Sequence, residues 1–183
     1  SLKDSLVQNC LMDTDGDTDP ACTGRHVESG HYYLGASLSS MAQQYIGAYL
    51  TGQGTLSSED VVIDMAGYSI TATGRAFYLR SKDAEGNANK LTLLDSYGGS
   101  SVTGRGANNQ GGGVLYNEGS ELTIYGGRYV YNPASGRNIA GGGVLISSGT
   151  LDIHGGILDG SAFAYTDMST TDKSYTYRGG AIS

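Results

Sequence analysis

The chain has 183 residues, enough for one domain with a sizeable core, and its 18 acidic against 11 basic residues give a net charge of −7. Nucleic-acid and anionic-membrane partners are not expected, because phosphate binding needs clustered Lys and Arg. No apolar run approaches the roughly 20 residues that cross a bilayer, so we expect no membrane insertion. A count of 30 glycines against 2 prolines, without a three-residue period, excludes collagen and argues against an ordinary helical protein.

Residues 1–60 differ from the rest of the chain and are interpreted as an N-terminal cap. They contain both cysteines, the acidic run DTDGDTD and the stretch SLSSMAQQYIGAYL at residues 37–50, where we expect one short helix. Because the chain starts at Ser1 rather than at a methionine, we expect a mature or excised segment, and the missing signal peptide says nothing about destination.

The acidic run suggests a cation site made of Asp13, Asp15, Asp17 and Asp19. Carboxylate oxygens are ligands that Ca²⁺ prefers, and carboxylates held close together repel one another unless a cation is present. The run does not follow an EF-hand loop, because Thr18 and Gly24 stand where that loop needs glycine and glutamate. Two interpretations stay open, a calcium loop of another kind and a solvated acidic turn.

Cys10 and Cys22 are close in sequence, and in an extracellular protein such a pair most often forms a disulfide. Closing so short a loop would stabilise the fold by about 3 kcal/mol in the chain-entropy model. The alternative is a zinc site that adds His26 and His31 to the two cysteines. A zinc site usually contains a tighter cysteine pair, so we expect the disulfide.

From residue 61 onward, short alternating strands are separated by Gly, Ser and Asn turns, as in a β-structure. One signature recurs, as GGGVLYNEGSELTIYGG at residues 111–127 and as GGGVLISSGTLDIHGG at residues 141–156. RGGAIS at residues 178–183 begins a third copy, and AFYL from Ala76 aligns with the earlier VLYN from Val114. A short fixed signature at variable spacing is typical of a solenoid whose turns differ in length.

The repeated Leu-x-Ile strands explain how such a chain would bury a core. Alternate side chains of a strand point to opposite faces, so one strand cannot bury its apolar face alone. In a stack of turns, Leu122 would lie over Leu151 and Ile124 over Ile153, with glycines at the sharp corners. The sequence therefore predicts an all-β fold, a right-handed parallel β-helix with an N-terminal cap; a β-sandwich is the rival architecture.

The segment VVIDMAGYSITATGRAFYL, with LTLLDS and the two GGGV signatures after it, resembles the pectate-lyase-like β-helix repeats of large surface proteins of gut Gram-positive bacteria. The resemblance covers about residues 60–183 and implies β-helix rungs over residues 61–183, truncated at the C-terminal end. The YYL at Tyr32–Leu34 resembles the segment that precedes the first rung in that family. An extracellular or cell-surface location follows from the resemblance, whereas no specific activity does.

Tyr125, Asp152 and His154 form the candidate ligand-binding patch. Asp152 and His154 alternate with apolar residues of their strand, so they should project outward on one face, with Tyr125 stacked beside His154 from the previous turn. An aromatic face suits a sugar ring, and a carboxylate and an imidazole suit its hydroxyl groups. The same patch is the best candidate acid–base pair. The alternative is an ordinary solvated surface.

Polysaccharide lyases and hydrolases on a β-helix need several carboxylates that converge across neighbouring rungs. The rung acids near the recognisable strands are Asp95, Glu121, Asp152 and Asp159. They do not share one column, because Asp152 aligns with Thr123 and Asp159 with Val130. The alignment therefore argues against an active site in these turns.

We accordingly expect a noncatalytic extracellular module that acts as an adhesin, a stalk or a surface for a glycan or a host protein. The alternative is the leading part of a carbohydrate-active β-helix enzyme. The polar insertion AYTDMSTTDKSYTYR at residues 164–178 is either a recognition loop or an ordinary variable loop. Self-association through an open C-terminal rung is a further expectation, since an unpaired strand edge recruits partners.

Overall fold

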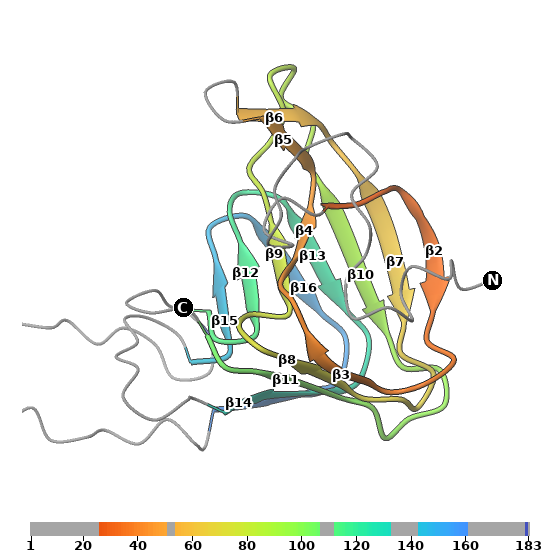
Figure 1. Ribbon diagram of the computed structural model, residues 1–183. Coiled ribbons are helices and arrows are strands. Elements are labelled where there is room, and N and C mark those ends of the chain that lie inside the picture. The colour runs from red at the N-terminus through yellow and green to blue at the C-terminus, as the bar shows by residue number, and fades with distance from the viewer. Residues whose placement is uncertain (1–25, 51–53, 107–111, 133–142, 161–181, 183) are drawn as a thin grey trace, which may run out of the picture.

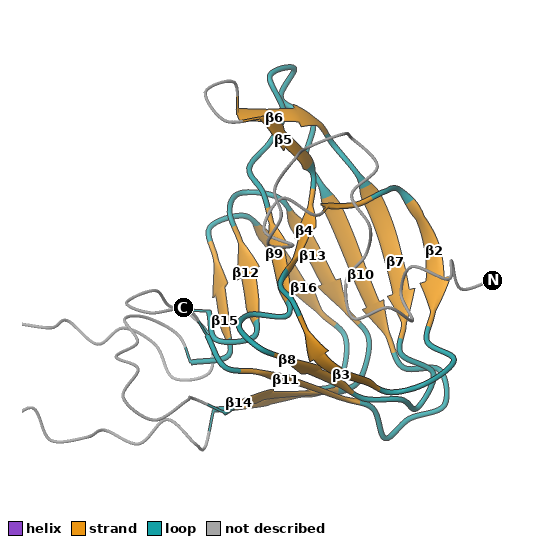
Figure 2. Cartoon of the chain, in the orientation of Figure 1, coloured by secondary structure: helices purple, strands orange, loops and turns teal. Residues whose placement is uncertain are grey.

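A computed structural model describes residues 26–50, 54–106, 112–132, 143–160 and 182. Over these residues the regular structure is entirely β, and its strands form three five-stranded parallel sheets and one two-stranded hairpin (Figures 1 and 2). Each turn of the chain contributes one strand to each of the three sheets, so successive turns lie one upon another as a parallel β-solenoid. The described part of the chain contains no helix long and apolar enough to cross a membrane.

The three parallel sheets are named here A, B and C, and each turn runs from B through C to A. Sheet A contains β1 (His26–Val27), β4 (Gln44–Ile46), β9 (Phe77–Leu79), β12 (Leu115–Asn117) and β15 (Leu145–Ser147). Sheet B contains β2 (Gly30–Tyr33), β7 (Asp60–Asp64), β10 (Lys90–Leu94), β13 (Glu121–Ile124) and β16 (Thr150–Ile153). Sheet C contains β3 (Leu38–Met41), β8 (Ile70–Ala72), β11 (Ser101–Gly104), β14 (Arg128–Tyr131) and β17 (Ile157–Asp159). The antiparallel hairpin of β5 (Ala48–Leu50) and β6 (Gly54–Ser57) lies between β4 and β7 in the chain.

The register of sheet B confirms the predicted stacking of the Leu-x-Ile strands. Leu122 pairs with Leu151 and Ile124 with Ile153, and on the other side Leu91 pairs with Leu122. Leu91, Leu122 and Ile124 are fully buried, which is expected where an aliphatic side chain has a counterpart in the turns above and below. Ile153, in the last described turn of sheet B, is still 42% exposed.

The GGG-apolar signature lies at the corner that leads from sheet C into sheet A. Leu115 pairs with both Phe77 and Leu145, as the alignment of AFYL, VLYN and VLIS requires, and Ile182 forms a parallel bridge to Leu145. Gly113 is needed because a Cβ atom there would lie 2.4 Å from the carbonyl oxygen of Gly143 in the next turn. Ile182, the described residue of the third copy, therefore lies in register with Leu145 and Leu115.

One sequence expectation is wrong. Residues 37–50 form β3, β4 and β5 rather than a helix (Figure 2). Ser40 and Gly47 have φ angles of 59° and 108°, which interrupt a right-handed helix. Strands β3 and β4 pair in parallel with β8 and β9 of the second turn, and β5 pairs with β6 in the hairpin, so each strand has a backbone partner. The parallel sheets consequently begin at His26, N-terminal to the boundary expected at residue 60.

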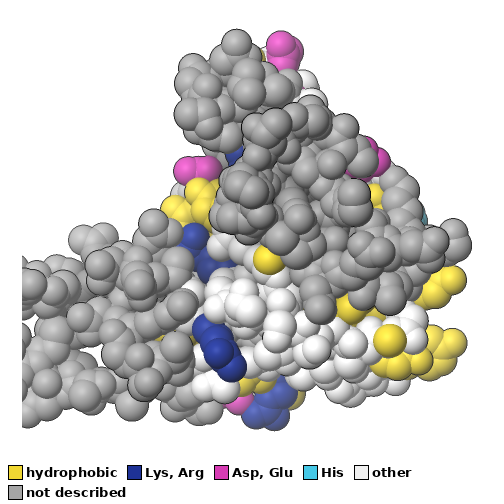
Figure 3. All heavy atoms as spheres, in the orientation of Figure 1, with side chains coloured by type: hydrophobic (Ala, Val, Ile, Leu, Met, Phe, Trp, Pro, Cys, Tyr) yellow, Lys and Arg dark blue, Asp and Glu magenta, His cyan; other side chains and the backbone are white. Residues whose placement is uncertain are grey.

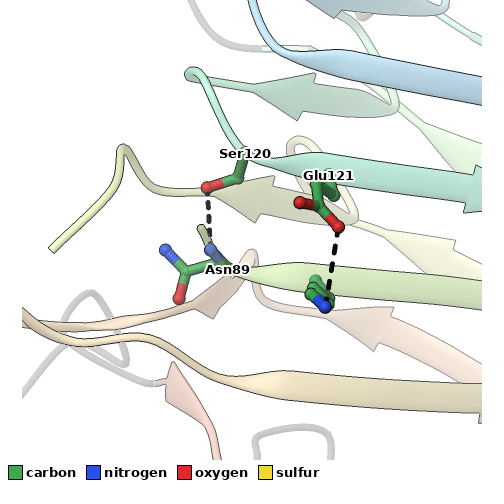
Figure 4. A network of polar contacts seen from close by, with 4 residues as sticks. Asn89, Ser120 and Glu121 are labelled. Carbon is green, nitrogen blue, oxygen red and sulfur yellow. Dashed lines mark hydrogen bonds and ion pairs between the residues drawn. The ribbon is translucent and has the colours of Figure 1, made fainter. Parts of the chain in front are cut away.

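Buried polar side chains hold the corner between sheets A and B. The Asn117 side chain donates to the Ser120 carbonyl oxygen at 3.0 Å and to the Thr150 carbonyl oxygen at 3.1 Å, and it accepts from the Ser120 backbone N–H at 2.8 Å. In the preceding turn, the Asn89 backbone N–H donates to the Ser120 hydroxyl at 3.1 Å (Figure 4). Asn89, Asn117 and Ser120 are buried, and each bond that crosses between turns fixes the rung spacing at this corner.

Candidate ligand-binding edge

The structure brings together two of the three predicted patch residues, Tyr125 and His154. Each directly follows a sheet B strand, and because Ile124 and Ile153 occupy inward register positions, the next residue faces outward. The two rings stack with centroids 4.6 Å apart and planes at 9°, and the His154 backbone N–H donates to the Ile124 carbonyl oxygen at 2.8 Å. Tyr125 is 52% exposed and His154 is exposed, so the stacked pair is open to solvent.

Asp152, the third predicted residue, lies in β16 two residues before His154 and is exposed. It pairs with Thr123, as the alignment predicted, and by strand alternation it projects from the same outer face of sheet B as His154. The three side chains therefore supply an aromatic surface, a carboxylate and an imidazole on one outer face. Their role in binding stays a prediction.

Three further tyrosines lie at the corner where sheet B leads into sheet C, called here the B–C edge. Tyr33 ends β2, whereas Tyr68 and Tyr97 lie in the turns that follow β7 and β10. Tyr97 is 84% exposed, and the other two are also exposed. Hydrophobic side chains gather at the lower right of the molecule in Figure 3, where the B–C edge lies in Figure 1.

Two aspartates hold the turns of this edge together. The Asp64 carboxylate accepts from the Ser96 backbone N–H of the next turn at 3.0 Å, and the Asp95 carboxylate accepts from the Gly67 N–H of the previous turn at 3.0 Å. Burial alone would raise the pKa of Asp95, but hydrogen bonds from Ser100, Gly67 and Gly98 outweigh it and lower the pKa. The pKa of Asp64 is lowered in the same way, so both groups are charged at neutral pH.

Sheet A carries a second aromatic array, which the sequence analysis did not single out. Tyr45, Tyr78 and Tyr116 are in register on its outer face, with ring centroids 5.4 Å apart for the first pair and 4.7 Å for the second. The alignment of AFYL with VLYN already placed Tyr78 over Tyr116 and could have revealed it. Unlike the exposed rings of the B–C edge, these three are half-buried.

Two arginines cover the sheet A array. The guanidinium of Arg80 lies 4.4 Å from the centroid of Tyr45, and that of Arg75 lies 4.6 Å from the centroid of Tyr116. Arg75 is buried, and its Nε donates to the carbonyl oxygen of Gly112 in the next turn at 3.0 Å. Burial, followed by the effect of Glu118, raises the pKa of Tyr78. The array therefore joins turns through cation–π and stacking contacts and offers little open ring surface.

The other candidate acids have partners within the fold. Glu121 forms an ion pair with Lys90 at 3.8 Å, and Asp159, which pairs with Val130 in register, forms an ion pair with Arg128. Within the described ranges, no three His, Cys, Asp or Glu side chains gather as metal ligands would. His31 is exposed in β2. The polar insertion at residues 164–178 lies outside the described residues. So do the residues of the calcium and disulfide predictions, which are Asp13, Asp15, Asp17, Asp19, Cys10 and Cys22.

Comparisons of the chain with protein-family models, with curated proteins and with solved structures found no match.

Proposed function

We propose that the chain is a noncatalytic β-solenoid module of a bacterial cell-surface protein, of the pectate-lyase-like kind, and that it binds a glycan at the B–C edge. The observation that carries the proposal is the parallel, solvent-exposed pair of Tyr125 and His154, with Asp152 on the same face. A flat aromatic surface favours the apolar face of a sugar ring, and neighbouring polar groups favour its hydroxyls.

The charge balance and the partners of the acidic groups support binding rather than turnover. Glu121 and Asp159 are engaged in ion pairs, and the Asp95 carboxylate accepts hydrogen bonds from Ser100 and Gly67. These groups serve the stacking of turns, whereas the exposed Asp152 carboxylate lies on the same face as the stacked pair of Tyr125 and His154. A module of stacked turns also suits a stalk, because each turn contacts only its neighbours and length can be added by repetition.

A glycan array with the purified chain tests the proposal. We expect signal on at least one glycan class, a reduced signal with Tyr125→Ala, and near-normal signal with Tyr125→Phe, which keeps the ring. Circular dichroism of each variant checks that the fold is retained. If Tyr125→Ala binds as strongly as the unmodified chain, or if the unmodified chain binds no glycan, the edge is not a glycan site.

A second function, carbohydrate cleavage, is favoured by the position of Asp152 and His154 on one face, where they could act as an acid–base pair. Incubation of the chain with pectin, mucin and host glycans, followed by chromatography of the products, separates the two functions. Turnover that is lost in both Asp152→Asn and His154→Gln would establish the enzyme and overturn the noncatalytic module.

A further inference from the structure

Each turn described in the structure places one aromatic ring at the B–C edge. The rings, called here the aromatic row, belong to Tyr33, Tyr68, Tyr97, Tyr125 and His154. Stacked strands are separated by about 4.8 Å, so five successive rings extend over roughly 19 Å along the solenoid axis. That length exceeds one sugar ring and matches an extended chain.

The turns that carry these rings are in contact with one another. The Cβ atom of Tyr97 lies 3.4 Å from the position of a Cβ atom on Gly67, which directly precedes Tyr68. Gly126, which directly follows Tyr125, would place a Cβ atom 3.2 Å from that of Asp95. Tyr125 and His154 are stacked. Consecutive members from Tyr68 to His154 therefore come from turns in direct contact.

We propose that the aromatic row binds a neutral, linear glycan whose chain runs along the solenoid axis, with successive sugar units on successive turns. This inference rests on the proposed function and adds the class of glycan, its direction and the residues beyond Tyr125 and His154. The predicted patch is then one end of a longer site.

Charge selects a neutral chain over an anionic one. The carboxylates of Asp64 and Asp95 lie within the edge, Asp152 is exposed beside its last ring, and the whole chain carries a net charge of −7. A polyuronate or a nucleic acid would bring further negative charge to this edge and be repelled. A neutral glycan avoids that repulsion and still offers hydroxyl donors to the carboxylate of Asp152.

A proline-rich peptide is the other extended partner that aromatic surfaces bind. Proline has no backbone N–H, so a polyproline segment brings few donors to the carboxylate of Asp152. Every sugar unit carries several hydroxyl donors. The polar groups beside the rings therefore favour the glycan.

Calorimetric titration with oligosaccharides of increasing length tests binding along the aromatic row. The probes are disaccharides, tetrasaccharides and hexasaccharides of β-1,4-linked glucose, xylose and mannose, with galacturonan hexasaccharide and a proline-rich peptide as comparisons. We expect affinity to rise with length in at least one neutral series. Tyr97→Ala should weaken hexasaccharide binding by about two- to tenfold, the value of one aromatic contact, and leave disaccharide binding unchanged.

Matched variants separate this inference from the proposed function. Tyr97→Phe keeps the ring and should bind as the unmodified chain does, and because Tyr97 is 84% exposed neither variant should affect folding. Tyr125→Ala should weaken both short and long probes. If Tyr125→Ala weakens binding but affinity neither rises with glycan length nor responds to Tyr97→Ala, the proposed function stands and the inference that a glycan chain binds along the aromatic row is wrong. A preference for galacturonan or the peptide, or no binding of any neutral series, also overturns the inference that a neutral glycan binds along the aromatic row.

Discussion

Gly113 and Tyr131 approach so closely that a Cβ atom on Gly113 would lie 2.1 Å from Cδ2 of the tyrosine ring. On its other side, the same atom would overlap the carbonyl oxygen of Gly143. Both neighbours belong to packed strands or corners, so neither can move aside without disturbing an adjacent turn. The middle glycine of the GGG signature is therefore a packing requirement of the corner.

Gly113→Ala is expected to lower the free energy of unfolding by about 1–3 kcal/mol, the usual cost of overpacking. Urea unfolding followed by circular dichroism measures it. Gly74→Ala is the matched control, because a Cβ atom there would lie 3.6 Å from the carbonyl oxygen of Gly106, an ordinary contact. Equal stability of the two variants would contradict the packing argument.

Asn117→Ala should also destabilise the fold. Asn117 is fully buried, and its side chain bonds to Ser120 and Thr150 at the corner between sheets A and B. Alanine leaves the buried Ser120 N–H without its acceptor, at about 1–3 kcal/mol, and removes one donor from each of the Ser120 and Thr150 carbonyl oxygens. Asn132→Ala, at an exposed position, should change the urea midpoint little. A midpoint for Asn117→Ala close to that of Asn132→Ala would show that the corner does not depend on the network.

Alkaline pH is expected to destabilise the chain through its buried tyrosines. Burial raises the pKa of Tyr78 and of Tyr129 in the folded state. A raised pKa in the folded state stabilises the fold fully below the unfolded value of about 10, and this contribution is lost as pH rises above it. Urea midpoints should therefore fall above about pH 10. They should fall less steeply for Tyr78→Phe, which keeps the ring but cannot ionise; an identical slope would exclude Tyr78 as a cause.

Acidic pH is expected to weaken the B–C edge, because it protonates the Asp95 carboxylate. The pKa of Asp95 is lowered in the folded state, so its contribution is present above its ordinary value of 3.8 and is lost as pH falls below it. Asp95→Asn should be less stable than the unmodified chain at pH 7, because the amide accepts the Ser100 and Gly67 N–H bonds less strongly. The difference in urea midpoint should shrink at about pH 3, and a constant difference would show that charge is not involved.

The stacking of turns could be predicted because apolar alternation and the glycine signature repeat in the chain. Leu122 over Leu151 follows from that alignment, and so does the stacked position of Tyr125 and His154, since each directly follows a repeated strand. Tyr68 and Tyr97 could not be placed in this way, because they lie in turns of different length and share no register position in the sequence.

The helix expected at residues 37–50 fails for a different reason. Polar and apolar residues in MAQQYIGAYL alternate at a spacing that suits either a helix or short strands, so local pattern does not decide between them. The segment forms strands because it pairs with the second turn of the solenoid, and the local sequence pattern does not reveal that pairing. The left-handed backbone at Ser40, which few residues other than glycine adopt, was likewise not detectable from residue type.

The three corners of the solenoid differ in how much chain they accept. Connections from sheet C to sheet A lengthen along the chain, and they join Met41 to Gln44, Ala72 to Phe77, Gly104 to Leu115 and Tyr131 to Leu145. After the short link from Val27 to Gly30, connections from sheet A to sheet B shorten along the chain. They begin with the hairpin-bearing one from Ile46 to Asp60 and continue with those joining Leu79 to Lys90, Asn117 to Glu121 and Ser147 to Thr150. Those from sheet B to sheet C stay short, and the last two join Ile124 to Arg128 and Ile153 to Ile157. Insertions at two corners can therefore vary the loops of the solenoid, while the links at the third corner stay short, so variation in loop length is concentrated away from the B–C edge.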